Sequence, residues 1–236
     1  MRQTMRLFQI GMRQTARDGM LFALLPAPFL VGLIFKFALP LANGIMTDRF
    51  GVTLIFWFPL ADGLLACLTP AFAAMASAFL LLEERDEGIG AFYQVSPAGG
   101  HAYLAARLGL PMLWAYAATA AALSLFCLTA LPLTLVLALS ALGSLTGAAL
   151  AMMVVSLAGN RVEGLALSKM MGVSFLGLFL AWFQPPYASL SAWLPSYWVG
   201  MLLRDGAIVP VCFGFGSIVS LLWIAVFTRR FLNRIS

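Results

Sequence analysis

The sequence predicts an all-α, polytopic membrane protein with six transmembrane helices. The chain has 236 residues, of which 62% are hydrophobic and only 10% are charged, and its mean hydropathy is +0.97. A soluble domain of this length needs far more charge to cover its surface. The composition therefore argues against a soluble enzyme, a nucleic-acid-binding domain and a disordered chain. The basic residues lie between long apolar stretches, which is typical of membrane proteins whose charges set their orientation.

Residues 1–19 are predicted to form an amphipathic helix that lies in the membrane interface. Apolar side chains recur there at helical spacing, while the arginines lie off this stripe. The alternative is an ordinary basic segment that leads into the first span. A cleaved signal peptide is disfavoured, because the apolar stretch that follows is longer than a signal h-region. The apolar stripe consists of Met1, Met5, Phe8, Met12 and Ala16.

Six apolar stretches are long enough to cross a bilayer, which takes about 20 residues. Before the last of them, residues 184–206 are apolar but interrupted by prolines and rich in Tyr and Trp. This mixture predicts short helices at the outer membrane boundary that dip back into the leaflet, with a plain aromatic loop as the alternative. The whole chain, residues 1–236, is predicted to form one transmembrane domain. The predicted spans are residues 20–41, 60–82, 108–129, 134–157, 167–183 and 208–227.

The distribution of Lys and Arg predicts the orientation of these spans. Of the 14 basic residues, Arg49 and Arg204 fall on one side, Lys36 lies within the first span, and all the others fall on the side of the N-terminus. Because cytoplasmic loops are enriched in Lys and Arg, both termini are predicted to be cytoplasmic. We therefore expect a multi-pass protein of the inner (plasma) membrane of a prokaryote.

The sequence contains no recognisable catalytic or metal-binding motif. A P-loop needs Gly-x-x-x-x-Gly-Lys-Ser/Thr to hold nucleotide phosphates, and neither lysine, Lys36 or Lys169, has that context. The single histidine, His101, cannot build a His-rich metal site. The three cysteines fall within predicted spans, without metal-ligand spacing. We therefore do not expect the chain to be an enzyme or to bind a cofactor itself.

The most charged segment runs from Glu83 to Gly88 and begins where the second span reaches the predicted cytoplasmic side. Acidic residues do not contribute to the positive-inside bias, so they suggest another role, although charge runs are often simply solvated. Further along, Ser96 is a good N-cap and Pro97 a good first helical residue. Together they predict a short helix that ends near Arg107 and docks on a partner.

The residues of this loop, 83–107, include Glu-Glu-Arg-Asp-Glu-Gly at 83–88, Ser-Pro at 96–97, Tyr-Leu at 103–104 and Arg107. In this order they resemble the loop between spans two and three of ABC-2 type transporter permeases. Residues 160–169 resemble the second cytoplasmic loop of a subgroup related to fluoroquinolone-export permeases. One departure lies after the glycine, where many members carry a Thr-Leu-Glu-like stretch and this chain has Ile89-Gly90-Ala91.

The resemblance implies the permease subunit of an ABC exporter. Two permeases, identical or paralogous, then form the route through the membrane and pair with two separate ATPase subunits. The ATPases bind ATP and Mg²⁺, while this chain supplies the route, contacts membrane lipids and carries the coupling loop 83–107. The residues that the resemblance assigns to ATPase coupling are Glu83, Glu84, Arg85, Asp86, Glu87, Gly88, Ser96, Pro97, Tyr103, Arg107, Arg161 and Glu163.

Two ionisable residues, Lys36 and Asp62, lie within or at the edge of predicted spans. Such residues are costly in hydrocarbon and are functional candidates by default. Both lie toward the outer ends of neighbouring antiparallel spans, so they are predicted to form an ion pair. The alternatives are a lysine that snorkels to the outer headgroups and an aspartate exposed at the boundary.

Glycines in the fourth and fifth spans predict close helix packing. Gly143 is followed by Gly147 one helical turn later, and Gly172 is followed by Gly177. Small residues at such spacing allow two helix backbones to approach each other, although they can also line a route.

Two other functions remain alternatives. An integral membrane enzyme that modifies lipids would need a cluster of inward polar residues, which the sequence does not reveal. A non-transporting immunity or assembly subunit with the same fold cannot be separated from a transporter on sequence alone.

Overall fold

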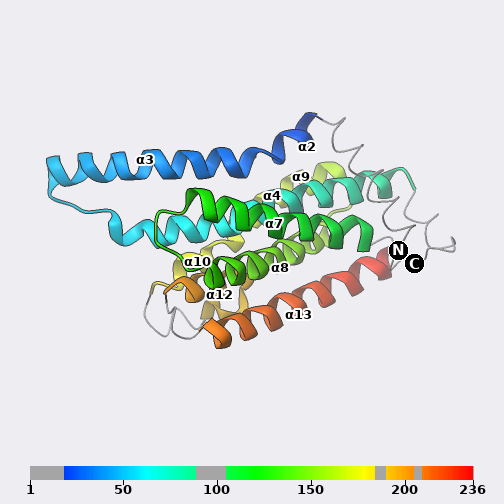
Figure 1. Ribbon diagram of the computed structural model, residues 1–236. Coiled ribbons are helices and arrows are strands. Elements are labelled where there is room, and N and C mark those ends of the chain that lie inside the picture. The colour runs from blue at the N-terminus through cyan, green and yellow to red at the C-terminus, as the bar shows by residue number, and fades with distance from the viewer. Residues whose placement is uncertain (1–18, 89–104, 184–189, 205–208, 236) are drawn as a thin grey trace.

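The computed structural model describes residues 19–88, 105–183, 190–204 and 209–235. Six helical stretches among them are long and apolar enough to cross a membrane, as predicted. The long helices run roughly side by side, and shorter helices pack near one end of the bundle (Figure 1). The described residues form helices and turns without any strand. The fold is therefore an all-α membrane bundle.

Twelve helical elements make up the described part of the chain. Apart from Gly19, the predicted interfacial helix at residues 1–19 lies outside this part. In chain order the elements are α2 (Gly19–Leu24), α3 (Ala27–Phe50), η1 (Ile55–Trp57), α4 (Phe58–Asp86), η2 (Ala105–Gly109), α7 (Leu110–Phe126), α8 (Leu133–Leu157), α9 (Arg161–Ser174), α10 (Leu176–Leu180), η3 (Ser191–Trp193), α12 (Pro195–Arg204) and α13 (Val209–Ile235).

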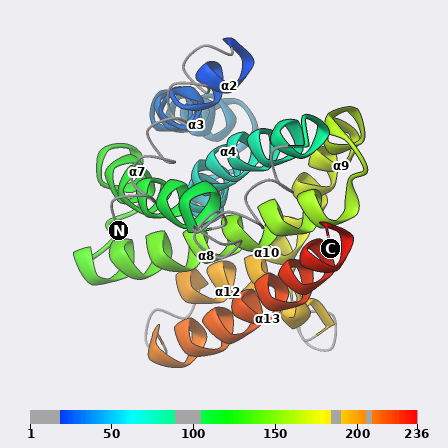
Figure 2. The ribbon, with the colours of Figure 1, turned by 90° about the vertical axis from the view of Figure 1, so that its right-hand side faces the viewer.

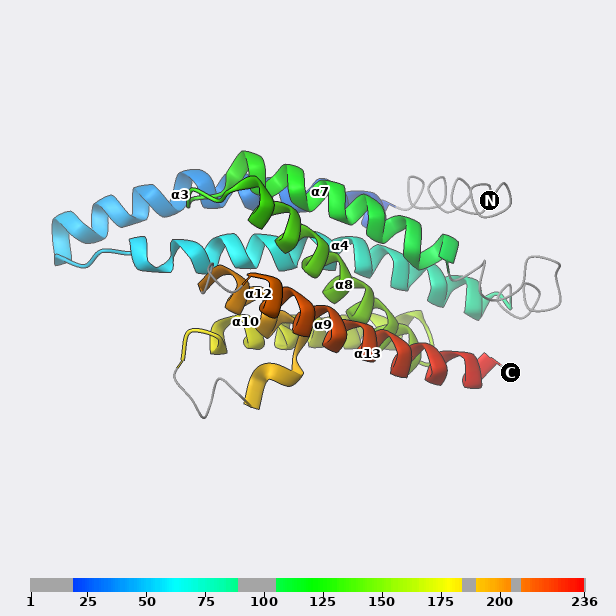
Figure 3. The ribbon, with the colours of Figure 1, turned by 60° about the horizontal axis from the view of Figure 1, so that its bottom comes forward.

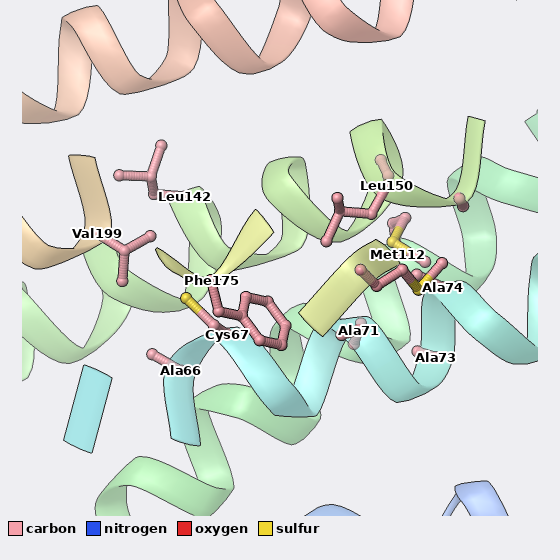
Figure 4. Close-up of a cluster of buried hydrophobic side chains, with 14 of the residues drawn as sticks. Ala66, Cys67, Ala71, Ala73, Ala74, Met112, Leu142, Leu150, Phe175 and Val199 are labelled. Carbon is pink, nitrogen blue, oxygen red and sulfur yellow. The ribbon is translucent and has the colours of Figure 1, made fainter. Parts of the chain in front are cut away.

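Helices α4 and α8 form the centre of the bundle. In each, 78% of the most apolar stretch is buried, against 11% in the first span and 17% in the last. Viewed along the bundle, α3, α7, α9 and α13 lie around this central pair (Figure 2). The core between them combines small side chains of α4, such as Ala71 and Ala74, with larger ones such as Leu150 of α8 and Phe175 (Figure 4).

Close contact between α4 and α8 depends on two glycines. A Cβ atom on Gly143 would lie 2.5 Å from the carbonyl oxygen of Ala66, and one on Gly147 would lie 2.8 Å from that of Pro70. Pro70, inside α4, has no N–H to donate to the carbonyl of Ala66, and this stretch of α4 lies against the two glycines of α8. The packing predicted for this pair is confirmed. Of the second pair, Gly177 is tightly packed against α12 while Gly172 faces open space.

Two helices extend beyond the apolar stretches that predicted them. Helix α3 continues past residue 41 to Phe50, where Gly51 adopts a left-handed conformation (φ 64°) and donates its N–H to Thr47. Helix α9 begins at Arg161, well before residue 167. Asn160 caps it, since its Oδ1 accepts a hydrogen bond from the N–H of Glu163 at 2.8 Å. Local caps, rather than the limits of the apolar stretch, determine these helix ends.

Short helices lie before the last span, in the described part of residues 184–206. There η3 leads into α12, and α12 packs against α10, α13 and α4. Trp198 of α12 stacks on Phe215 of α13 with ring centroids 5.4 Å apart, and its Nε1 donates to the carbonyl of Ala192 at 2.8 Å. The prediction of short helices, rather than a plain loop, is therefore confirmed in this part.

Candidate functional site

The end of α4 meets the ends of three other spans. Helix α7 begins, α8 ends and α9 begins at this same end of the bundle, where α13 also ends (Figures 1 and 3). Four consecutive charged residues close α4, and each binds a different group on these neighbouring elements. We call this set, Glu83, Glu84, Arg85 and Asp86, the charged junction.

Glu84 forms a buried ion pair with Arg107, which precedes α7. The Nε of Arg107 donates to Oε2 of Glu84 at 3.0 Å, and its Nη2 contacts Oε1. Each side chain is 2% exposed. Arg107 belongs to η2, a π-helical turn, and such turns occur frequently at functional sites. The pair therefore ties the end of the second span to the start of the third.

Arg85 binds the end of α8. Its two Nη atoms donate to the carbonyls of Val155 at 3.3 Å and Ala158 at 2.8 Å. The last carbonyls of a helix have no partner within the helix, and a cation near them is favourable for the helix dipole as well. Arg85 therefore acts as a side-chain cap for α8.

The two other acidic residues bind the start of α9. Asp86 accepts a hydrogen bond from the backbone N–H of Arg161 at 3.0 Å, and Glu83 lies 3.4 Å from the guanidinium of the same residue. Glu163 accepts from the N–H of Gly159. Carboxylates are favourable at a helix N-terminus, where the first N–H groups lack partners. The start of α9 is therefore held by three carboxylates and by its cap.

These contacts change the interpretation of the predicted coupling residues. Glu84 and Arg107 were expected on a docking surface, but both are buried and face each other. Charge alone does not distinguish a solvated residue from one that is paired in the core. The sequence pattern therefore predicted that Glu84 and Arg107 lie on the surface. Asp86, Glu87 and Gly88 are exposed at the end of α4. The remaining predicted residues Ser96, Pro97 and Tyr103 lie outside the described part of the chain.

Lys36 binds the last turn of α7 and Asp62 binds the turn between α7 and α8, but they do not bind each other. The Nζ of Lys36 donates to the carbonyl of Leu125 in the last turn of α7. The carboxylate of Asp62, which is buried, accepts from the backbone N–H groups of Leu128 at 2.8 Å and Thr129 at 3.0 Å, and from the Thr129 hydroxyl. These backbone partners could not be predicted, because a sequence does not show which turn lies beside a side chain.

Two features that can indicate catalysis are a cluster of metal-ligating side chains and a pocket lined by polar groups, and we looked for both in the described residues. They contain no group of three or more His, Cys, Asp or Glu that could hold a metal ion. One open pocket of about 290 Å³ lies between α3 and the start of α4, and its lining is apolar. The lining residues are Phe35, Leu39, Leu54, Trp57, Phe58, Leu60, Ala61 and Leu64.

Comparisons with known proteins agree with this architecture. A family model described as fluoroquinolones export permease protein Rv2686c-like matches residues 11–228. The chain is 27% identical over 233 residues to the fluoroquinolones export permease protein Rv2686c of Mycobacterium tuberculosis strain ATCC 25618 / H37Rv. The same values hold for the protein MT2760 of strain CDC 1551 / Oshkosh. Each alignment covers 93% of this chain and 90% of the relative. No solved structure matches the chain.

Proposed function

The chain belongs to the Rv2686c-like family of fluoroquinolones export permease proteins, and from this premise we propose that it is the membrane subunit of an ABC-2 type exporter. It is a multi-pass membrane permease with six apolar helices. In the proposed complex, a separate ATPase subunit binds ATP and Mg²⁺ and docks on the end of the bundle that carries the charged junction. A second permease, identical or paralogous, completes the route.

The observation that carries this proposal is the charged junction itself. Residues 89–104, which contain the proposed coupling helix, lie between Glu84 and Arg107 in the chain. The ion pair of these two residues therefore closes the base of the loop, and Arg85 and Asp86 extend the contacts to α8 and α9. A displacement of the loop by an ATPase reaches four spans through these contacts. A permease driven by a separate motor needs such a connection.

Other features support the same arrangement. The end with the charged junction also carries Arg229 and Arg230 of α13, so the excess of basic residues supports its assignment to the cytoplasm. The names of the relatives support export of a lipophilic aromatic compound, and we propose that class of substrate for this chain. The membrane is then the plasma membrane of a prokaryote.

The proposal predicts that an ATPase is encoded beside this chain, and the test is co-expression of the two, followed by purification through a tag on the permease. We expect the ATPase to co-purify and to hydrolyse ATP faster with the permease than alone. Glu87→Lys reverses an exposed charge beside the charged junction and should weaken this association. Asp48→Lys is the matched control, because Asp48 is equally an exposed acidic residue but lies at the far end of α3.

Two results would contradict the proposal. One is the absence of any co-purifying ATPase, and the other is equal loss of association in both variants. Uptake of a fluorescent quinolone into inverted vesicles then separates a transporter from a non-transporting subunit. ATP-dependent uptake supports export, and ATP hydrolysis without uptake argues against it.

A further inference from the structure

The open pocket between α3 and the start of α4 is lined by apolar side chains. A water molecule inside a protein needs about two to four polar partners, so water does not fill such a space well. A gap of about 290 Å³ also leaves the side chains around it without part of their packing contacts. The pocket therefore fits an apolar occupant.

The pocket lies at the end of the bundle opposite the charged junction. Two of its lining residues, Phe35 and Ala61, are next in sequence to Lys36 and Asp62, which bind the end of α7 and the turn that follows it. The third span, Arg107–Phe126, has 20 residues. At a rise of about 1.5 Å per residue it is about 30 Å long, which is the thickness of the hydrocarbon core. The pocket is therefore level with the outer boundary of the hydrocarbon, where a lipid of the outer leaflet can reach it.

An arginine lies further out on the same face of α3. Phe35 and Leu39 line the pocket, and their helix face continues at spacings of three and four residues through Ala42 and Met46 to Arg49. Arg49 is ten residues after Leu39, which places its Cα about 15 Å further along the helix axis. Helical side chains lean toward the N-terminus of their helix, which for Arg49 is the direction of the pocket. Arg49 is exposed, and neither ion pair between described residues includes it.

We propose that this pocket binds an acyl chain of an outer-leaflet phospholipid whose phosphate is held by Arg49. A guanidinium group can bind a phosphate through two parallel hydrogen bonds. The arginine side chain and the glycerol of the lipid span the distance between the phosphate and the pocket. A ligand that carries polar groups is a poorer occupant, because these groups would lack partners among the apolar side chains.

A lipid at this site would join two helices that pack loosely. The apolar stretch of the first span is only 11% buried, while that of α4 is 78% buried. The acyl chain would fill the gap between α3 and α4 and so add packing contacts that the chain itself does not supply. This role does not depend on the proposed export function or on an ATPase.

The experiment is native mass spectrometry of the full-length permease, which is delipidated in detergent and then titrated with one lipid at a time. The probes are dioleoylphosphatidylglycerol and dioleoylglycerol, which has the same acyl chains but no phosphate. We expect the wild-type protein to bind the phospholipid about tenfold more tightly than the diacylglycerol, as for a charge-assisted hydrogen bond. Arg49→Gln should remove this difference by weakening phospholipid binding alone. Its matched control is Arg230→Gln, which removes an exposed arginine at the other end of the bundle and should leave the difference unchanged.

Leu39→Trp tests the pocket itself, because the larger side chain occupies space that the acyl chain needs. It should weaken the binding of both lipids about tenfold, as if about two methylene groups lost their place in the pocket. Leu64→Trp fills the same space from α4, so the test does not depend on the folding of one variant. The matched control is Leu113→Trp, on the exposed face of α7, which should leave both affinities unchanged.

The proposal is wrong if the wild-type protein binds neither lipid or binds both equally, or if Arg49→Gln keeps the preference for the phospholipid. It is also wrong if both pocket variants bind the lipids as tightly as the wild-type protein does. Displacement of the phospholipid by norfloxacin would overturn it as well, because the pocket then takes a quinolone. No ATPase is present in this measurement, so its failure is distinct from a failure of the proposed complex.

Discussion

Removal of one member of the buried pair Glu84–Arg107 should destabilise the protein strongly. Both side chains are 2% exposed, so Glu84→Leu removes the carboxylate that binds the guanidinium of Arg107 in a buried site. Breaking a buried pair in this way typically costs about 3–5 kcal/mol. For a chain of this size, such a loss lowers the melting temperature on the order of 10 °C.

Replacing both members of the pair should be less harmful than replacing one. A buried ion pair that is replaced by apolar side chains of similar volume often leaves stability unchanged. Glu84→Leu combined with Arg107→Met should therefore regain most of the stability that either single variant loses. Glu83→Leu is the control, because Glu83 belongs to the half-exposed pair with Arg161, and such pairs contribute less than about 1 kcal/mol.

Thermal unfolding of the four variants in detergent measures these differences, with the wild-type protein alongside. The reasoning fails if Glu84→Leu lowers the melting temperature no more than Glu83→Leu does. It also fails if the double variant is as unstable as the sum of the single variants, because the two side chains then act independently.

Three further changes test other parts of the structure by the same unfolding assay. Gly143→Val places a side chain against the carbonyl of Ala66 and should cost about 1–3 kcal/mol, whereas Gly172→Ala, in open space, should change the melting temperature little. Asp62→Ala leaves two N–H groups of the α7–α8 turn without their acceptor and should cost about 1–3 kcal/mol; an unchanged melting temperature would show that water replaces the carboxylate. Asn160→Ala removes the cap of α9 and should cost about 1 kcal/mol, an effect that Asn160→Asp should avoid.

The six spans were predictable because each one contains enough consecutive apolar residues to cross a bilayer. The helix ends were less predictable, since they depend on local contacts. Helix α9 starts at Arg161 because Asn160 caps it, a signal that is present in the sequence but is masked by the polar residues that follow. The end of α3 at Gly51 is a similar case.

The contacts within the charged junction could not be predicted from the sequence. The sequence indicated Glu84 and Arg107 as members of one charged loop, but their burial depends on how α4 and α7 pack, which charge patterns do not reveal. Lys36 and Asp62 were expected to bind each other, and instead Lys36 binds the last turn of α7 and Asp62 binds the turn that follows it. Their partners are backbone carbonyl and N–H groups. Because nearly every residue carries these groups, no sequence pattern shows which of them will bind Lys36 or Asp62.

The two anchors on α4 have a consequence for movement. Near its start, α4 holds the turn beyond the end of α7 through Asp62, and near its own end it holds Arg107 before the start of α7 through Glu84. Sliding or rolling of α4 against α7 would break one anchor or the other. These two contacts therefore resist sliding between α4 and α7, and we expect the two helices to move together in any rearrangement of the bundle. The apolar stretches of α3 and α13 are the least buried of the six spans, so they have fewer packing contacts to hold them against this pair.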